Sequence, residues 1–212
     1  MPIKIIVEPK EVERVKKLGA LWLPGEGTWV IPDTVKKINS FRRWLPDDEG
    51  YIVQRPYFVV KTKRACLKCG KETPIVALGA KNYHSLFHKT ENRGSWRRIG
   101  YPTLFSDITY LDEEIVQSLQ EYYPFFQYAH SYCDEYPEEY GESEDSWVNT
   151  CVHCKTVQED IYNFMDGNAP LSPIYEEEMS KLHIVYFKLR FDYYIQAGEM
   201  HSPLFEEMMK GR

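Results

Sequence analysis

Cys66-Leu67-Lys68-Cys69-Gly70 and Cys151-Val152-His153-Cys154 are the two segments that decide the organisation of this 212-residue chain. Each contains a Cys-x-x-Cys pair, and that spacing lets two thiolates hold one metal ion from a tight turn. Gly70 suits the left-handed backbone conformation that such a turn needs after its second ligand. Four thiolates are a typical ligand set for a closed structural site of Zn²⁺. We therefore predict one structural zinc ion, with four ligands: Cys66, Cys69, Cys151 and Cys154.

The residues around the two pairs predict a zinc ribbon that is split by a long insertion. Strand signals follow both pairs, at 73–77 and at 158–164. Lys155 stands where the first pair has Gly70, which predicts a different geometry for the second turn. Four thiolates around Zn²⁺ leave a charge of about −2, which nearby cations can compensate. The candidate cations are Lys63, Arg64, Lys68, Lys71 and Lys155.

Two other uses of these cysteines and the nearby histidines were weighed. Cys66 and Cys69 with His84 and His88 match zinc-finger spacing, but this choice leaves Cys151 and Cys154 unused, and Pro74, Gly79 and Asn82 lie where the finger helix belongs. His84, His88 and Asn92 are also similar to the catalytic set of His-Asn-His nucleases, although no Asp-His pair is present. We expect His84 and His88 to lie on one side of a short amphipathic helix instead.

Residues 1–46 predict a small β-α-β-β-α module. A strand at 3–7 precedes a helix at 9–18, and two strands follow around the turn-forming segment 24–27. A second helix is expected from Asp33 or Thr34 up to Pro46. The polar range 47–56 predicts a linker, and 57–212 a zinc-ribbon-based α+β domain with inserted helices at about 78–150. The fold class is therefore α+β.

Part of this module resembles a known family. Leu18, Gly19, Ala20, Trp22, Trp29 and Pro32 carry a likeness to a small uncharacterised bacterial domain found in plasmid primase-like and other DNA-processing proteins. A fainter likeness links the helix and hairpin to the DNA-binding HepA-related module of annealing helicases. The remainder, with its segments NTCVHC and CGKETPIVALG, looks like hypothetical bacterial proteins that carry a split zinc ribbon. The resemblance implies a fold for about a fifth of the chain and no settled activity.

The charge of the chain is divided unevenly along its length. Residues 1–100 hold 20 Lys/Arg and 10 Asp/Glu, and residues 101–212 hold 6 and 22, so the two halves carry +10 and −16. The halves could pack together and neutralise, or the basic half could attract phosphates. Basic residues with interleaved aromatics offer such contacts at 81–98. The candidate nucleic-acid contacts are Lys81, Lys89, Arg93, Trp96, Arg97 and Arg98.

These features predict a non-catalytic, zinc-stabilised binding protein that contacts nucleic acid through its basic N-terminal half. The alternative is a protein-interaction, inhibitor or immunity-type protein that uses its acidic C-terminal half, and a metal-dependent nuclease is a third reading. No phosphate-binding loop, nucleophile elbow or deaminase motif is present. The absence of a secretory signal, of a long apolar segment and of an even cysteine count predicts a cytoplasmic protein without a membrane partner. Cys133 is expected to be an unreactive, buried thiol.

Overall fold

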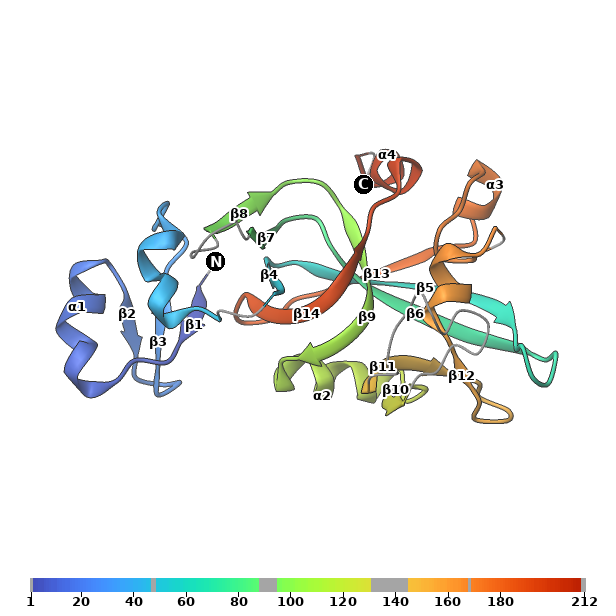
Figure 1. The fold of residues 1–212 in the computed structure, drawn as a ribbon, viewed down its shortest axis with the longest axis horizontal. Coiled ribbons are helices and arrows are strands. Elements are labelled where there is room, and N and C mark those ends of the chain that lie inside the picture. Colours follow the sequence, from blue (N-terminus) through green and yellow to red (C-terminus); the bar gives the residue numbers. More distant parts are fainter. Residues whose placement is uncertain (1, 47–48, 88–94, 131–144, 168, 211–212) are drawn as a thin grey trace.

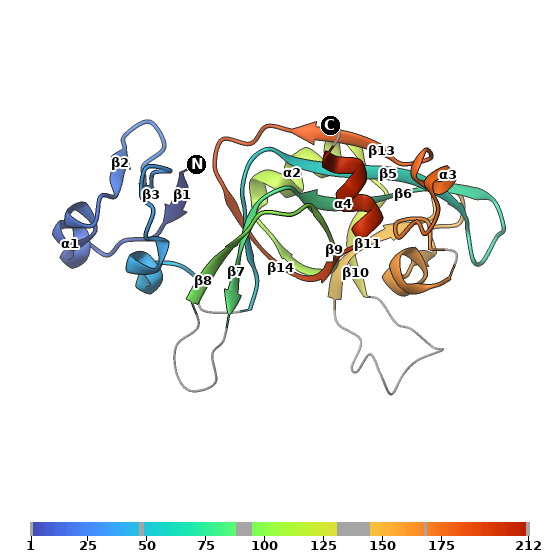
Figure 2. The same ribbon diagram turned by 90° about the horizontal axis from the view of Figure 1, so that it is seen from above.

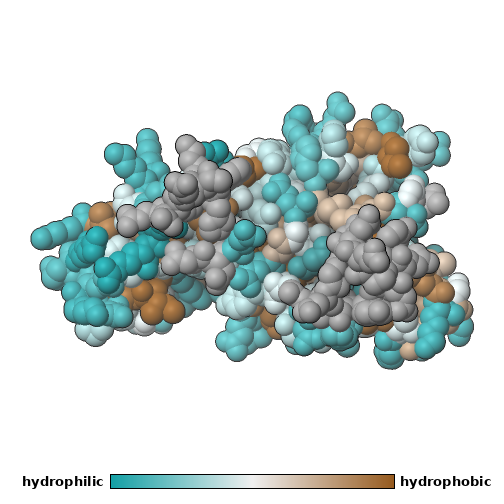
Figure 3. Space-filling view, viewed as in Figure 1, coloured by the Kyte–Doolittle hydropathy of each residue, from teal (hydrophilic) through white to brown (hydrophobic). Residues whose placement is uncertain are grey.

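The computed structural model describes residues 2–46, 49–87, 95–130, 145–167 and 169–210 (Figure 1). Within these ranges the architecture is α+β, as predicted, with a three-stranded and an eleven-stranded sheet whose described strand pairings are antiparallel. No helix in these ranges is long and apolar enough to cross a membrane. The face of the molecule drawn in Figure 3 is mostly hydrophilic, with small separate apolar patches.

The first 46 residues form the small module in the predicted order. It consists of β1 (Ile3–Ile5), η1 (Pro9–Glu11), α1 (Val12–Lys17), β2 (Leu21–Leu23), β3 (Thr28–Ile31) and η2 (Ile38–Trp44), with sheet order β1-β3-β2. The second helix begins at Ile38 rather than at Asp33 and is a 3-10 helix. The apolar residues Ile38, Phe41 and Trp44 are spaced by three, and a 3-10 helix places that spacing on one face, where all three are buried.

The large sheet has the strand order β13-β5-β6-β9-β14-β4-β7-β8, and it curves strongly (Figure 2). The bounds are β4 (Tyr51–Val53), β5 (Tyr57–Ala65), β6 (Glu72–Ala80), β7 (Tyr83–Phe87), β8 (Ser95–Ile99), β9 (Thr103–Leu111), β13 (His183–Phe187) and β14 (Tyr193–Met200). A side branch starts where Trp147 of β11 (Asp145–Thr150) pairs with Ile108 of β9. β11 also pairs with β10 (Phe126–His130) and β12 (Val157–Gln158).

Several local predictions were wrong because they rest on residue spacing within one segment, whereas contacts between distant segments decide where strands and helices form. The range 78–150 is mainly sheet, and its one helix in the described residues is α2 (Glu113–Tyr122). His84 lies on β7 rather than on a helix. The segment after β12, predicted as a strand at 158–164, turns into the short π-helix η3 (Ile161–Met165). The range predicted as a linker contains β4, which pairs with β14 and β7.

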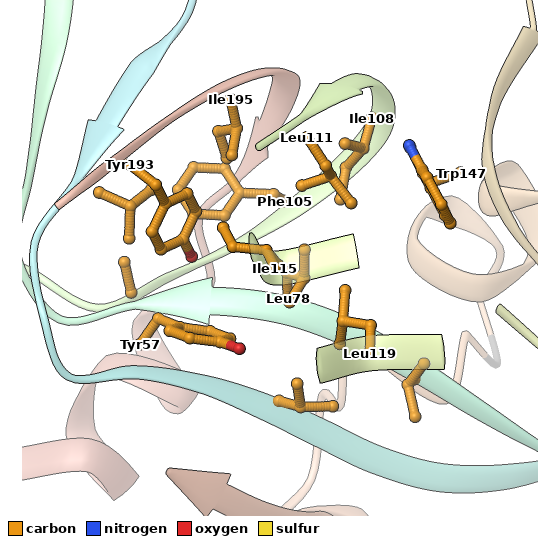
Figure 4. Packing of buried hydrophobic residues seen from close by; sticks show 14 of the residues in the cluster. Tyr57, Leu78, Phe105, Ile108, Leu111, Ile115, Leu119, Trp147, Tyr193 and Ile195 are labelled. Carbon is orange, nitrogen blue, oxygen red and sulfur yellow. The ribbon is translucent and has the colours of Figure 1, made fainter. Parts of the chain in front are cut away.

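The large sheet is covered on both faces by buried side chains. On one face, Ile115 and Leu119 of α2 point toward Tyr57, Leu78 and other buried residues of the sheet (Figure 4). On the other face, Phe164 of η3 and Phe205 of α4 (Pro203–Lys210) pack against Phe58, Ile75 and their neighbours. The remaining helix is the short α3 (Glu176–Met179).

A third cluster joins the module to the large sheet. Phe41 and Trp44 of the module pack with Ile52 of β4, Leu86 of β7 and Trp96 of β8. The side chain of Asn39 bonds both backbone groups of Trp96, accepting from its N–H (2.8 Å) and donating to its C=O (3.0 Å). The module and the sheet therefore share a buried apolar contact.

Candidate metal centre

The two Cys-x-x-Cys turns each join the strands of one hairpin. The first lies between β5 and β6, and the second lies between β11 and β12. The tip of the first hairpin projects at the end of the molecule opposite to the module (Figure 1). Both turns are thus carried by paired strands, which fix the direction of their ligands.

The two turns have the same backbone geometry, so the prediction that Lys155 would alter the second turn was wrong. In each, the residue after the second cysteine donates its N–H to the C=O of the first cysteine: Gly70 to Cys66 and Lys155 to Cys151, both at 2.9 Å. Both residues adopt a positive φ, 70° for Gly70 and 63° for Lys155. Lys155 therefore adopts the left-handed conformation, which is unfavourable for a residue with a Cβ atom, because the geometry of the turn requires it.

The four sulfur atoms lie at the spacing of a tetrahedral metal site. All four Sγ atoms are within 4.8 Å of one another. Cys66 Sγ is 3.6 Å from Cys154 Sγ, and Cys69 Sγ is 3.8 Å from Cys151 Sγ. A tetrahedron with Zn–S distances of about 2.3 Å has sulfur atoms roughly 3.8 Å apart. These distances are too long for disulfides, whose sulfur atoms are about 2.05 Å apart, so the cluster fits a metal ion.

Hydrogen-bond donors surround the sulfur atoms, as thiolates require. The backbone N–H of His153 lies 3.4 Å from Cys151 Sγ, and Nε2 of Gln158 lies 3.5 Å from Cys66 Sγ. The hydroxyl and the backbone N–H of Thr156 lower the pKa of Cys154 to about 6. The environment of Cys154 therefore favours the deprotonated form, which is the form that binds metal. The backbone N–H of Lys71 acts to lower the pKa of Cys69, but burial and the hydrogen bonds of the three other thiols raise it to about 11.

Side chains outside the turns hold the two hairpins against each other. Asn149 of β11 clamps Val76 of β6 by accepting from its N–H (2.8 Å) and donating to its C=O (2.9 Å). The N–H of Val152 donates to Thr73 Oγ1 (3.1 Å), and His153 Nε2 lies 3.0 Å from the C=O of Glu72. Asn149 and Thr73 could not be identified from the sequence, because no local motif sets them apart from other polar residues. The one available signal is that Asn149 lies two residues before the candidate ligand Cys151.

The predicted compensating cations are only partly arranged for that role. Arg64 is half-buried, interacts electrostatically with Cys66, and donates to Asn163 Oδ1 at 3.0 Å. Lys63 pairs with Glu72 at 2.8 Å. Lys68, Lys71 and Lys155 are exposed. Of the five candidate cations, Arg64 is thus the one described as interacting with a candidate metal ligand, Cys66.

The rival metal set is not assembled in this structure. Within the described residues, one group of at least three potential metal ligands lies close together, and it consists of the four cysteines. His84 is not part of it. His84 instead pairs across strands with Ile52 and Arg98, beside the module. His88, Asn92 and Cys133 lie outside the described residues.

The predicted nucleic-acid contacts do not form one surface. Trp96 is buried, with 2% of its surface exposed, so its ring offers no face on which a base could stack. Arg97 and Arg98 are both exposed but, as neighbours on β8, point to opposite faces of the sheet. Lys81 lies over the ring of Tyr186, 5.5 Å from its centroid. The two remaining candidates, Lys89 and Arg93, lie outside the described residues.

Comparison with known proteins adds no relative. No protein family, no curated protein and no solved structure matches the chain. What the protein does must therefore be argued from its own residues.

Proposed function

We propose that this is a non-catalytic binding protein whose larger domain is a split zinc ribbon stabilised by one Zn²⁺. The convergence of the four Sγ atoms carries the zinc assignment. Four thiolates at tetrahedral spacing suit zinc or iron, and four protein ligands leave no open position for catalysis. Metal analysis of protein purified without added metal tests the assignment, and iron or an absence of metal would contradict it.

We further propose nucleic acid as the ligand of the basic half. The imbalance of +10 against −16 is the main support. In the described residues the halves are joined by ion pairs such as Lys4 with Glu114, at 3.5 Å, and Arg190 with Glu26. The side chains of these pairs are partly exposed, and such pairs contribute little. Arg97 and Arg98 are exposed on the two faces of β8, where we propose that they contact phosphates. The likeness of the module to a domain of DNA-processing proteins agrees with this choice.

A salt titration of binding to single- and double-stranded DNA and RNA tests the nucleic-acid proposal. Each cation on a phosphate adds about one unit to the slope of log affinity against log salt. Replacing Arg97 and Arg98 by Ala should flatten that slope by up to about two. Glu176→Gln with Glu177→Gln serves as the control and should leave the slope unchanged. Undetectable binding to every nucleic acid at low salt would refute the proposal.

A protein partner for the acidic half is the second candidate, favoured by one exposed segment. Ile174 and Tyr175 are 56% and 67% exposed and directly precede the three glutamates that begin α3. Apolar side chains beside acidic ones suit a partner with a basic, partly apolar surface. The same glutamate variant would then slow association with that partner, whereas the arginine variant would not. A nuclease has no further support, because no second convergent metal set exists in the described residues.

A further inference from the structure

A cleft of about 560 Å³ lies where the module meets the large sheet. Its module wall is mainly aliphatic and includes Ile3, Ile31, Val35 and Ile38. Its opposite wall comes from the sheet, from the end of β4, the turn before β7, and β8. The cleft thus has one apolar wall and one polar wall, as small-molecule sites commonly do.

Strand register explains why the sheet wall is polar. Cross-strand partners share a face, so Ile52, His84 and Arg98 lie in one row, and Leu86 and Trp96 lie in the next. Leu86, Trp96 and Ile52 are buried against the module. His84 and Arg98 instead line the cleft, together with the two residues of the following row, Gln54 and Asn82. Polar groups at the rim of an apolar contact lie where a ligand could reach them.

Two of these polar side chains are incompletely satisfied. Gln54 Oε1 and His84 Nδ1 are buried and have no hydrogen-bond partner among the described residues. Leaving such an atom unpaired is unfavourable, so a ligand that pairs with it gains affinity. Burial and the nearby charge of Arg98 lower the pKa of His84 to about 4, so its ring is neutral at pH 7. The neutral ring offers one donor and one acceptor.

The charges around the cleft favour an anion. Lys36, Arg55 and Arg98 line it, against a single carboxylate, that of Asp33. Arg55 already donates to the C=O of Leu189 at 2.7 Å. Among the described residues, Arg98 makes a long contact, 3.5 Å, to Asn82 Oδ1, and both Arg98 and Lys36 are exposed. These two cations lie on opposite walls of the cleft, so both can attract an anion that enters it.

We propose that this cleft binds a nucleoside phosphate, either free or as one nucleotide of a strand. Arg98 and Lys36 bind the phosphate, the base lies against the aliphatic wall, and its polar edge meets Gln54 and Asn82. The cleft is larger than a phosphate ion needs, and the apolar wall and amide groups match a base. This inference rests on the proposed nucleic-acid function for the ligand class, and it adds the place and the size of the recognised unit.

Calorimetric titration with the four ribonucleoside 5′-monophosphates, their nucleosides and inorganic phosphate tests the inference. Mononucleotides should bind more tightly than either fragment. Arg98→Ala and Lys36→Ala should each weaken mononucleotide binding about 10-fold or more, the effect of losing a charged hydrogen bond. Lys37→Ala is the matched control, because Lys37 is an exposed neighbour of Lys36 that does not line the cleft, and it should change nothing.

Three results would overturn the inference: no mononucleotide binds at millimolar concentration, inorganic phosphate binds as well as a mononucleotide, or Lys37→Ala weakens binding as much as Lys36→Ala. Thermal unfolding of each variant verifies that it is folded, which is expected because both cations are exposed. Binding of oligonucleotides without binding of mononucleotides would defeat the cleft inference and leave the proposed function standing. Binding of mononucleotides without binding of oligonucleotides would support the cleft inference and contradict the proposed nucleic-acid function.

Discussion

Replacing Lys155 by glycine should stabilise the protein, although glycine usually destabilises. Lys155 has a φ of 63° at the position that Gly70 occupies in the other metal-binding turn. A residue with a Cβ atom loses about 1–2 kcal/mol in this left-handed conformation. Glycine also gives the unfolded chain more conformational freedom, and this lowers the free energy of unfolding by about 0.5–1 kcal/mol. Lys155→Gly should therefore raise the free energy of unfolding by about 0.5–1 kcal/mol.

A second substitution separates the backbone effect from the loss of charge beside the thiolates. Lys155→Ala removes the same charge but keeps the Cβ atom, so Lys155→Gly should be the more stable of the two by about 1 kcal/mol. Lys68→Gly is the control in the first turn, where φ is not positive, and it should lose about 0.5–1 kcal/mol. Gly70→Ala should lose about 1 kcal/mol, which is purely conformational because no heavy atom lies within 4 Å of the added Cβ.

Thermal unfolding in the same excess of zinc measures these differences at equal metal saturation. For a chain of this length, 1 kcal/mol corresponds to a shift in Tm of about 2–4 °C. The reasoning fails if Lys155→Gly melts no higher than Lys155→Ala. It also fails if Lys68→Gly and Lys155→Gly shift Tm in the same direction and by the same amount.

Three other outcomes are expected. Purified protein should contain one zinc ion per chain, and Cys66→Ser or Cys151→Ser should release it and unfold the larger domain, as circular dichroism would show; a folded, metal-free protein would contradict this. With zinc bound, a thiol reagent should titrate at most one thiol, that of Cys133, whereas three would indicate the mixed cysteine–histidine site. Burial raises the pKa of Asp160 from 3.8 to about 7, so the folded state holds this proton more tightly than the unfolded chain does. Stability should therefore decrease as the pH rises from about 4 to about 7, and Asp160→Asn should abolish that decrease in pH-dependent denaturation; an unchanged profile would refute it.

The parts of the fold that were predicted correctly depend on short-range rules. The two Cys-x-x-Cys pairs fix their own turns, and the strands at Tyr57 and Thr73 follow from local β-propensity. The module was found because each of its elements ends at a glycine or proline. The ligands were therefore identified without knowledge of the fold, since four thiolates in two such pairs have few other uses.

What the sequence did not reveal depends on contacts between distant segments. β7 pairs with β4 and β8, and only this pairing decides that His84 is in a strand and faces the module. From the sequence, Trp96 was predicted to be an exposed aromatic residue because arginines lie beside it. Its burial depends on packing against Leu86 and the module, which the sequence does not show. The cleft was missed for the same reason, because its walls come from segments separated by many residues.

The free energy of binding zinc can offset the entropic cost of closing the long insertion between the two cysteine pairs. Cys69 and Cys151 are 82 positions apart, and closing a flexible loop of that length costs about 4 kcal/mol. Besides the cysteines, hydrogen bonds of Asn149, Val152 and His153 link these hairpins in the described residues. A four-thiolate zinc site contributes about 10–16 kcal/mol in small peptides, which exceeds the closure cost severalfold. The metal can thus hold the ends of a long insertion together while the strands of that insertion pair with β4, β5 and β14 in the large sheet. The strands of that sheet carry the cleft at the opposite end of the molecule, so the residues that recognise a ligand can differ without disturbing the site that stabilises the fold.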